Sequence, residues 1–374
     1  MKIAIINLTG GGLSGGYKKY IVNVFPRLFD NKQIKDLLIF FPPQALNFVS
    51  LNNFPAQTWP FIDYYNGFMW LKSQIKKFSP DVIFIPTARW FCAGKVPVVS
   101  MIQNMAPLVF PFQGSIKETA KNMIRYYQSK RAIQKSTRII ALSNYVKNFL
   151  VKKWGIKENK IGVVYHGVSL SNIKIIKPKA LKHLDNQIFI FTAGSIYPYR
   201  GLEDIIFAFN NLTKNLNNIY LVIAGEVPQS MKSYKSKLDG LIKSLNIHSK
   251  VIWTGFLSDE EMSWCYKNCS LFVTTSRIEA CPNIVLEAMA NGCLCVSTDS
   301  PPMPEFFGDI AIYYRAKNIE SLTEAILKIL FLDDKKKQEI SKRIMSIAYS
   351  FSWDICAKKT IEQLQKAIDE YKKK

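Results

Sequence analysis

Short apolar runs rich in β-branched and aromatic residues alternate with helix-forming stretches along the whole chain. In the first half these runs predict strands at residues 2–8, 36–41, 81–86, 96–102, 138–143 and 162–165. In the second half they predict strands at residues 187–193, 220–224, 251–254, 271–275, 294–298 and 310–313. Strands that alternate with helices are typical of β-α-β units, so we expect an α/β protein with parallel sheets.

The two sets of strands indicate two doubly wound, Rossmann-like domains. A chain of 374 residues exceeds what one hydrophobic core usually supports, and a polar, lysine-rich segment around Pro178 separates the two sets. We therefore predict an N-terminal domain at 1–170, a linker at 171–186 and a C-terminal domain at 187–352. The apolar run from Met1 is too short for a signal peptide, and no apolar stretch is long enough to span a membrane.

Positive charge is concentrated in the first half of the chain. Residues 1–180 contain 26 Lys and Arg against 6 Asp and Glu, and residues 181–374 contain 24 against 22, so the net charges are +20 and +2. A domain this basic is expected to bind an anionic partner, such as a phospholipid surface, a pyrophosphate-bearing substrate or nucleic acid. No recognised nucleic-acid-binding module accompanies the charge, so we expect no nucleic acid partner.

The clearest basic segment is residues 115–138, where Lys and Arg mix with Met, Ile and Tyr. This composition fits an interfacial amphipathic helix on an anionic membrane. A surface helix with a solvated basic face stays open as the alternative.

The seven cysteines form an odd set without a C-x-x-C pair, and the chain has three histidines. This inventory predicts reduced cytosolic thiols, not a disulfide framework. Cys265 and Cys269 have helical i, i+4 spacing, but without a second pair of ligands they indicate a packed helix face instead of a metal site. We expect neither a metal nor a cofactor.

Two carboxylates bracket the segment Glu279-Ala-Cys-Pro-Asn-Ile-Val-Leu-Glu287, which follows a predicted strand and opens a helix. With Asn283 as the expected N-cap, the helix start presents backbone amides and the positive end of the helix dipole, which favour a bound phosphate. Glu279 would lie just outside that phosphate site. Glu287 stands on an otherwise apolar helix and needs a partner or a cleft. The alternative is that both carboxylates are solvated.

Three other loops follow predicted strands, where doubly wound sheets bind ligands. Gly10, Gly12 and Gly15 satisfy G-x-G-x-x-G, but no acidic residue ends the second strand, so these glycines predict close approach to a substrate or a mobile loop. In the loop from Gly194 to Gly201, Arg200 adds a full charge ahead of a helix start. After the next two strands, the loops with Glu226 and with Phe256 and Leu257 are expected to line a nucleotide pocket.

Taken in order, these segments resemble the retaining group 1 (family 4) nucleotide-sugar glycosyltransferases, which have the GT-B fold. The resemblance covers nearly the whole chain and is most specific at residues 194–201, 275–304 and 351–353. It implies two Rossmann-like domains that face each other across a cleft, the first for the acceptor and the second for the sugar donor. It also implies that a last helix at 353–374 crosses back to pack on the N-terminal domain.

The resemblance assigns roles residue by residue. Arg200 matches the basic residue that grips the diphosphate, Glu279 lies beside the transferred sugar, and Glu287 binds the ribose. The remaining donor-binding candidates are Gly15, Gly16, Ser195, Phe256, Leu257 and the backbone amides of Asn283, Ile284 and Val285. The family needs no metal and retains the anomeric configuration, with the leaving diphosphate taking the acceptor's proton.

Three positions depart from the family pattern. Ser195 replaces a second diphosphate-binding Arg, Asn104 replaces a sugar-contacting His, and Ala280-Cys281-Pro282 replaces a glycine-rich triplet. We still expect a hexosyl-type transferase with a polyprenyl-pyrophosphate-linked glycan acceptor, in bacterial O-antigen or capsule synthesis. It would be cytoplasmic and peripheral on the inner face of the cell membrane. The alternative is a non-catalytic nucleotide-sugar-binding protein of the same fold.

Overall fold

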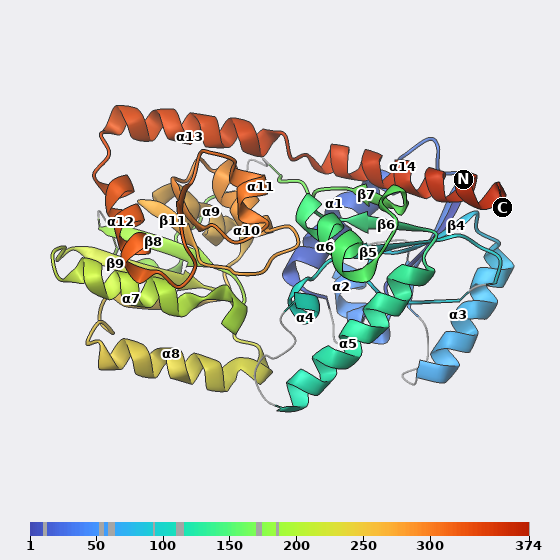
Figure 1. Cartoon of the computed structure of the whole chain (residues 1–374), viewed down its shortest axis with the longest axis horizontal. Coiled ribbons are helices and arrows are strands. Elements are labelled where there is room, and N and C mark those ends of the chain that lie inside the picture. Colours follow the sequence, from blue (N-terminus) through green and yellow to red (C-terminus); the bar gives the residue numbers. More distant parts are fainter. Residues whose placement is uncertain are drawn as a thin grey trace. The chain divides into compact units, whose positions relative to one another are not determined.

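The computed structural model describes residues 1–9, 13–51, 56–58, 64–92, 94–109, 116–169, 174–184 and 187–373 (Figure 1). The chain forms two compact units. One consists of Met1–Leu108, Lys121–Gly167 and Ser352–Lys374, and the other consists of Val109–Ala120 and Val168–Phe351.

Within the described residues, the first unit holds a seven-stranded parallel sheet of order β3-β2-β1-β4-β5-β6-β7. Its strands are β1 (Lys2–Ile6), β2 (Asp36–Phe41), β3 (Ala56–Thr58), β4 (Val82–Ile85), β5 (Val98–Ile102), β6 (Arg138–Ala141) and β7 (Ile161–Val163). The four residues of β4 are all buried, as expected of a parallel strand with both faces covered. The edge strand β3 was not predicted from the sequence, because its three residues have no apolar pattern and none of them is buried.

Helices cover this sheet, and the last helix of the chain is one of them (Figure 1). They are α1 (Gly15–Phe29), α2 (Leu46–Leu51), α3 (Tyr64–Phe78), α4 (Ala106–Val109), α5 (Ile116–Lys135), α6 (Asn144–Trp154) and α14 (Trp353–Lys372), with short 3₁₀ turns at Pro43–Ala45 and Glu158–Lys160. Helix α14 packs on α1 and β6, where the buried Arg138 donates to Gln363 Oε1 at 2.9 and 3.0 Å. The predicted return of the C-terminal helix to the first domain is therefore confirmed.

The second unit holds a six-stranded parallel sheet of order β10-β9-β8-β11-β12-β13 in its described residues. Its strands are β8 (Ile188–Ala193), β9 (Ile219–Ala224), β10 (Val251–Gly255), β11 (Leu271–Thr274), β12 (Cys295–Thr298) and β13 (Ile312–Tyr314). Its helices are α7 (Leu202–Thr213), α8 (Lys232–Ser244), α9 (Asp259–Asn268), α10 (Asn283–Ala290), α11 (Met303–Phe307), α12 (Ile319–Leu330) and α13 (Asp334–Tyr349), with 3₁₀ turns at Lys179–Leu181, Pro198–Arg200 and Gln229–Met231.

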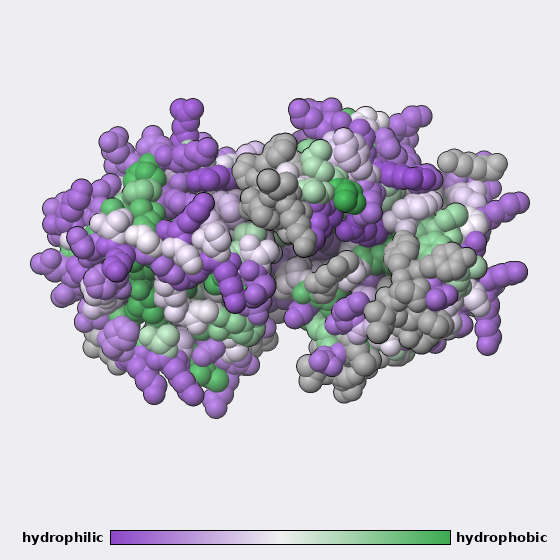
Figure 2. Space-filling view, turned by 90° about the horizontal axis from the view of Figure 1, so that it is seen from below, coloured by the Kyte–Doolittle hydropathy of each residue, from purple (hydrophilic) through white to green (hydrophobic). Residues whose placement is uncertain are grey.

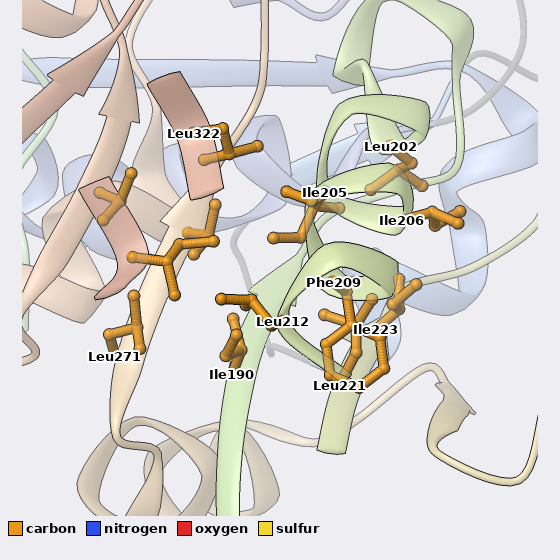
Figure 3. Close-up of a cluster of buried hydrophobic side chains, with 14 of the residues drawn as sticks. Ile190, Leu202, Ile205, Ile206, Phe209, Leu212, Leu221, Ile223, Leu271 and Leu322 are labelled. Atoms are coloured by element: carbon orange, nitrogen blue, oxygen red, sulfur yellow. The ribbon is translucent and has the colours of Figure 1, made fainter. Parts of the chain in front are cut away.

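The core of the second unit fixes the position of α7 on the sheet. Figure 3 shows Ile205, Phe209 and Leu212 of α7 packed against Ile190 of β8 and Leu221 of β9. Each of these side chains is at most 1% exposed, and burying one contributes about 1.5–3 kcal/mol. The first turn of α7, and the loop that leads into it from β8, are held in place by this packing.

The strand predictions are confirmed, since all twelve predicted strands form and pair in two parallel sheets. Part of the segment predicted as a linker packs on the second unit, because Leu181 and Leu184 are buried there. Residues 170–173 and 185–186 of that segment lie outside the described residues. Among the helices described, none has a long enough apolar stretch to cross a lipid bilayer.

Candidate active site

The strand order of the second sheet reverses between β8 and β11. Strands β9 and β10 follow on one side of β8, and β11 to β13 follow on the other. Doubly wound sheets bind ligands at the carboxyl ends of the strands at such a switch point. A pocket opens here, lined by Thr192, Ala193, Gly194, Arg200, Leu202, Ile223, Thr274, Thr275 and Ser276.

The loop from β8 to α7 needs glycine at both of its ends. Gly194 has φ +127°, and a Cβ there would lie 3.0 Å from Cζ of Arg200. Gly201 has φ +61°, and a Cβ there would lie 2.8 Å from the carbonyl oxygen of Thr275. Both positions combine a left-handed backbone with a close approach that only glycine allows.

An ion pair joins this loop to the loop after β11. Nη1 of Arg200 donates to Oε1 of Glu279, and the two side chains are 17% and 13% exposed. Ser276 Oγ donates to the same carboxylate oxygen at 3.0 Å. Thus the structure brings together the two residues predicted to be catalytic, in direct contact with each other.

The surroundings of Arg200 favour its charged form. Burial lowers the pKa of Arg200, but the Glu279 carboxylate and Tyr199 outweigh burial, so the pKa lies above its ordinary value. Burial also raises the pKa of Tyr199 to about 12, and the Tyr199 ring lies 5.6 Å from the Arg200 guanidinium carbon. Nε of Arg200 is buried and has no hydrogen-bond partner among the described residues, which leaves a donor at the pocket wall.

A second ion pair, which was not predicted from the sequence, joins the loop after β11 to the first turn of α7. Nη2 of Arg277 donates to Oδ1 of the buried Asp204 at 2.8 Å. Oδ2 of Asp204 accepts from Tyr314 Oη at 3.1 Å and from the backbone amide of Lys317 at 3.0 Å. In sequence, Asp204 fits an ordinary first-turn helix acid and Arg277 a surface loop residue, so no local pattern signals their contact.

Helix α10 begins at Asn283, and Pro282 is its N-cap. The prediction of Asn283 as the N-cap is therefore wrong by one position. Proline can take this position because the N-cap contributes its carbonyl to the first helical hydrogen bond and needs no N–H of its own. The amide of Val285 donates to the Pro282 carbonyl at 3.0 Å, so this predicted phosphate donor already has an acceptor. The helix start itself, with Asn283 and Ile284, lies in the loop-to-helix position that favours anions.

Glu287 lies on α10 and accepts from Oη of the buried Tyr266 at 3.3 Å. Tyr266 Oη is also 3.2 Å from the carbonyl oxygen of Ile284. Burial, reinforced by the Glu287 charge, raises the pKa of Tyr266 well above its ordinary range. Tyr266 is thus the partner that the sequence analysis required for Glu287 but did not identify.

The other donor candidates of the second unit lie at the ends of its neighbouring strands. Ser195 follows β8 and is half-buried, and the next amide, of Ile196, donates to the Glu226 carbonyl at 2.9 Å. Phe256 and Leu257 follow β10, where Phe256 is exposed and Leu257 is buried.

The candidates from the first half of the chain belong to the first unit. Gly15 and Gly16 form the first turn of α1 after the N-cap Ser14, so they are helical and not part of a loop as predicted. Gly10 and Gly12 lie outside the described residues. Asn104 is exposed, and its Oδ1 accepts from the Ala106 amide at 2.8 Å at the start of α4.

Two Rossmann-like units, one with a pocket at the switch point of its sheet, define an α/β protein of two doubly wound domains. Residues 174–345 match the family described as glycosyl transferases group 1, and residues 38–172 match glycosyltransferase family 4. The chain belongs to the group 1, family 4 glycosyltransferases, which confirms the resemblance seen in its sequence.

Relatives of known name match parts of the chain. The N-acetylgalactosamine-N,N'-diacetylbacillosaminyl-diphospho-undecaprenol 4-alpha-N-acetylgalactosaminyltransferase of Campylobacter jejuni is 29% identical over 54% of this chain. An uncharacterised glycosyltransferase of Methanocaldococcus jannaschii is 24% identical over 63% of this chain. The matches span 53% and 61% of the length of these two relatives.

Solved structures share the fold over almost the whole chain. Anabaena HepE in complex with UDP-glucose has a TM-score of 0.77 at 16% identity, covering 98% of this chain and 100% of HepE. A glycosyltransferase from Rickettsia africae has a TM-score of 0.76 at 16% identity, covering 98% of both chains. These likenesses confirm the predicted GT-B fold.

Proposed function

We propose that the protein transfers a hexosyl-type sugar from a nucleoside-diphosphate sugar to a glycan acceptor, with retention of configuration and without a metal ion. The observation that carries this proposal is the contact of Arg200 with Glu279 at the switch-point pocket. In such a transfer, negative charge develops on the leaving diphosphate, and fixed positive groups stabilise it. Arg200 is a fixed cation with a buried, unpartnered Nε at the pocket wall.

In the proposed mechanism each predicted residue has one task. Arg200 binds the diphosphate, the start of α10 adds the positive end of its dipole, and Glu279 orients the departing sugar. Glu287 binds the ribose of the donor and is positioned by Tyr266. The acceptor's proton passes to the leaving diphosphate, since no side chain is assigned as general base.

We further propose a polyprenyl-pyrophosphate-linked acceptor at the anionic, cytoplasmic face of a bacterial membrane, in O-antigen or capsule synthesis. The excess of basic residues in the first half of the chain supports an anionic partner. The name of the Campylobacter relative includes a diphospho-undecaprenol group, and a mannosyltransferase of Escherichia coli named as serotype-specific is 24% identical over 64% of this chain. Both names agree with a surface-glycan acceptor.

Helix α5 supports contact with a membrane surface. Ile124 and Tyr127, one turn apart, are 57% and 62% exposed, and Lys121 and Arg131 on the same helix are exposed. Exposed apolar residues flanked by cations are typical of helices that lie at an anionic lipid surface. Figure 2 shows a mostly hydrophilic surface on which hydrophobic side chains form separate spots.

A nucleotide screen followed by two variants tests the transfer. Thermal shift with uridine, guanosine and thymidine diphosphates and their sugars should reveal one that stabilises the fold by mass action. Glu279→Gln and Glu287→Gln should then each lower transfer or donor hydrolysis with that sugar. Binding without any measurable transfer or hydrolysis in the wild type would favour the non-catalytic alternative, and no binding at all would contradict the proposal.

A further inference from the structure

In the second unit, the loop after β11 forms one ion pair with the β8–α7 loop and another with the first turn of α7. Arg200 of the loop from β8 to α7 forms an ion pair with Glu279 of the loop after β11. Arg277 of the loop after β11 forms an ion pair with Asp204 in the first turn of α7. The same loops share two further bonds, from Thr275 Oγ1 to the Arg200 carbonyl at 2.6 Å and from the Arg277 amide to the Tyr199 carbonyl at 2.8 Å.

The two ion pairs differ in how completely the carboxylates are satisfied. Both oxygens of Asp204 accept hydrogen bonds, and the residue is 3% exposed. Glu279 accepts through Oε1 alone, and among the described residues no hydrogen bond reaches its Oε2. Separating Arg277 from Asp204 would leave a buried carboxylate without its cation. Arg200, in contrast, lines the pocket, where a ligand can replace Glu279 as its partner.

We propose that Arg277 and Asp204 are positioning residues that form a permanent clamp between the two loops. When the donor binds, Arg200 leaves Glu279 and contacts the diphosphate. The Arg277–Asp204 clamp then keeps the two loops in place while the Arg200–Glu279 pair is broken. This inference rests on the proposed function for the identity of the ligand. The clamp itself is a property of the unliganded protein.

The first measurement needs no ligand. The amide of Arg277 donates across the loops to Tyr199, so its hydrogen exchange reports separation of the loops. Breaking the first pair with Glu279→Gln should leave this exchange rate unchanged. Breaking the clamp with Asp204→Asn should raise it by about tenfold. Tyr314→Phe keeps the ion pair but removes one hydrogen bond to Asp204, so it should raise the exchange rate less. This variant serves as the test if Asp204→Asn does not fold.

The second measurement uses nucleotides as probes, in the full chain. The ratio of the Kd for a nucleoside monophosphate to that for the diphosphate measures how well the loops hold the second phosphate. Arg277→Gln should lower this ratio by about tenfold, because Arg200 is no longer held in position, and Arg277→Lys should restore part of it. Arg343→Gln is the matched control, since it breaks an exposed pair with Asp309 in the same unit and should leave the ratio unchanged.

The outcomes separate the clamp from the proposed function. Equal exchange of the Arg277 amide in Glu279→Gln and Asp204→Asn would overturn the clamp, whatever the nucleotides do. A lower melting temperature in Arg277→Gln with an unchanged ratio of Kd values would also overturn it, since that result fits a purely structural pair. A wild-type protein that binds none of the uridine, guanosine or thymidine phosphates would instead overturn the proposed function, while the exchange experiment still decides on the clamp.

Discussion

The two units share a topology but differ in the chemistry at the point where each strand order reverses. In both sheets the strand that comes first in its unit, β1 or β8, has the chain's next strands on one side and later strands on the other. In the described part of the first unit, the buried side chains Asn7 and Tyr17 lie near this point and are neutral. Tyr17 Oη donates to Asn7 Oδ1, and Asn7 Nδ2 donates to the Phe40 carbonyl at 2.8 Å.

In the second unit the corresponding loops hold two Arg–carboxylate pairs. The half of the chain with nearly balanced charge thus holds two ion pairs in its site, and Arg200 of one pair lines the pocket. The strongly basic first half carries cations on surface helices such as α5, where Lys121 and Arg131 are exposed. The net charge of a unit and the charge of the residues in its binding site are therefore separate properties. In the function that we propose, the second unit recognises the donor and the first unit is attracted to an anionic surface.

Among the variants that test this difference between the units, Arg200→Gln should have the largest effect. Removing the cation that faces the diphosphate should lower transfer by about 100- to 1,000-fold, the range found when one charge-stabilising donor is lost. Initial rates at saturating donor measure the effect. Arg343→Gln, an exposed arginine of the same unit, should keep wild-type rates, and equal losses in both variants would contradict a local role for Arg200.

Glu279→Gln should separate binding from transfer. Transfer should fall by about 100-fold, because the departing sugar loses its charged neighbour. The affinity for the free nucleoside diphosphate should rise severalfold, since Arg200 no longer has a competing carboxylate. Calorimetry with the diphosphate alone checks the second part, and weaker binding would show that Glu279 prepares Arg200 instead of competing for it.

The sequence predicted the fold better than it predicted the contacts within the site. Strands such as β4 and β8 are continuous apolar runs, so local pattern suffices to find them, and only β3 escaped. Arg200 and Glu279 were identified separately by position. Their contact joins residues 79 apart in sequence and depends on the exact path of two loops between strands. The Arg277–Asp204 pair was missed for the same reason.

Gly201→Ala tests the path of the β8–α7 loop. The left-handed φ of +61° and the predicted 2.8 Å approach of the new Cβ to the Thr275 carbonyl should lower stability by about 1–3 kcal/mol. Urea unfolding measures the change. Gly240→Ala is the control, because Gly240 lies in α8 with open space around it and should gain about 0.5–1 kcal/mol. Equal destabilisation of the two variants would argue against strain at Gly201.

The role assigned to the first unit is tested by a double variant, Ile124→Ser with Tyr127→Ser. The loss of two exposed apolar side chains should weaken binding to phosphatidylglycerol-containing vesicles by about five- to tenfold at low salt. Co-sedimentation measures it. Phe331→Ser removes a side chain that is 74% exposed in the second unit and should not change binding. A wild-type protein that stays in the supernatant at low salt would contradict the membrane proposal.

The smallest expected effect concerns Tyr199, which lies beside Arg200. Burial raises its pKa to about 12, and a tyrosine in the unfolded chain titrates near about 10. Because the folded pKa is the higher one, the contribution of Tyr199 to stability is complete below about pH 10 and is lost as the pH rises towards about 12. Tyr199→Phe should therefore flatten the decline of unfolding free energy across this window, measured by urea titration at each pH. The exposed Tyr349→Phe controls for loss of a hydroxyl, and equal flattening in both variants would contradict a special environment for Tyr199. A positive result would locate part of the alkaline sensitivity of the second unit at Tyr199, beside the guanidinium that we propose binds the donor.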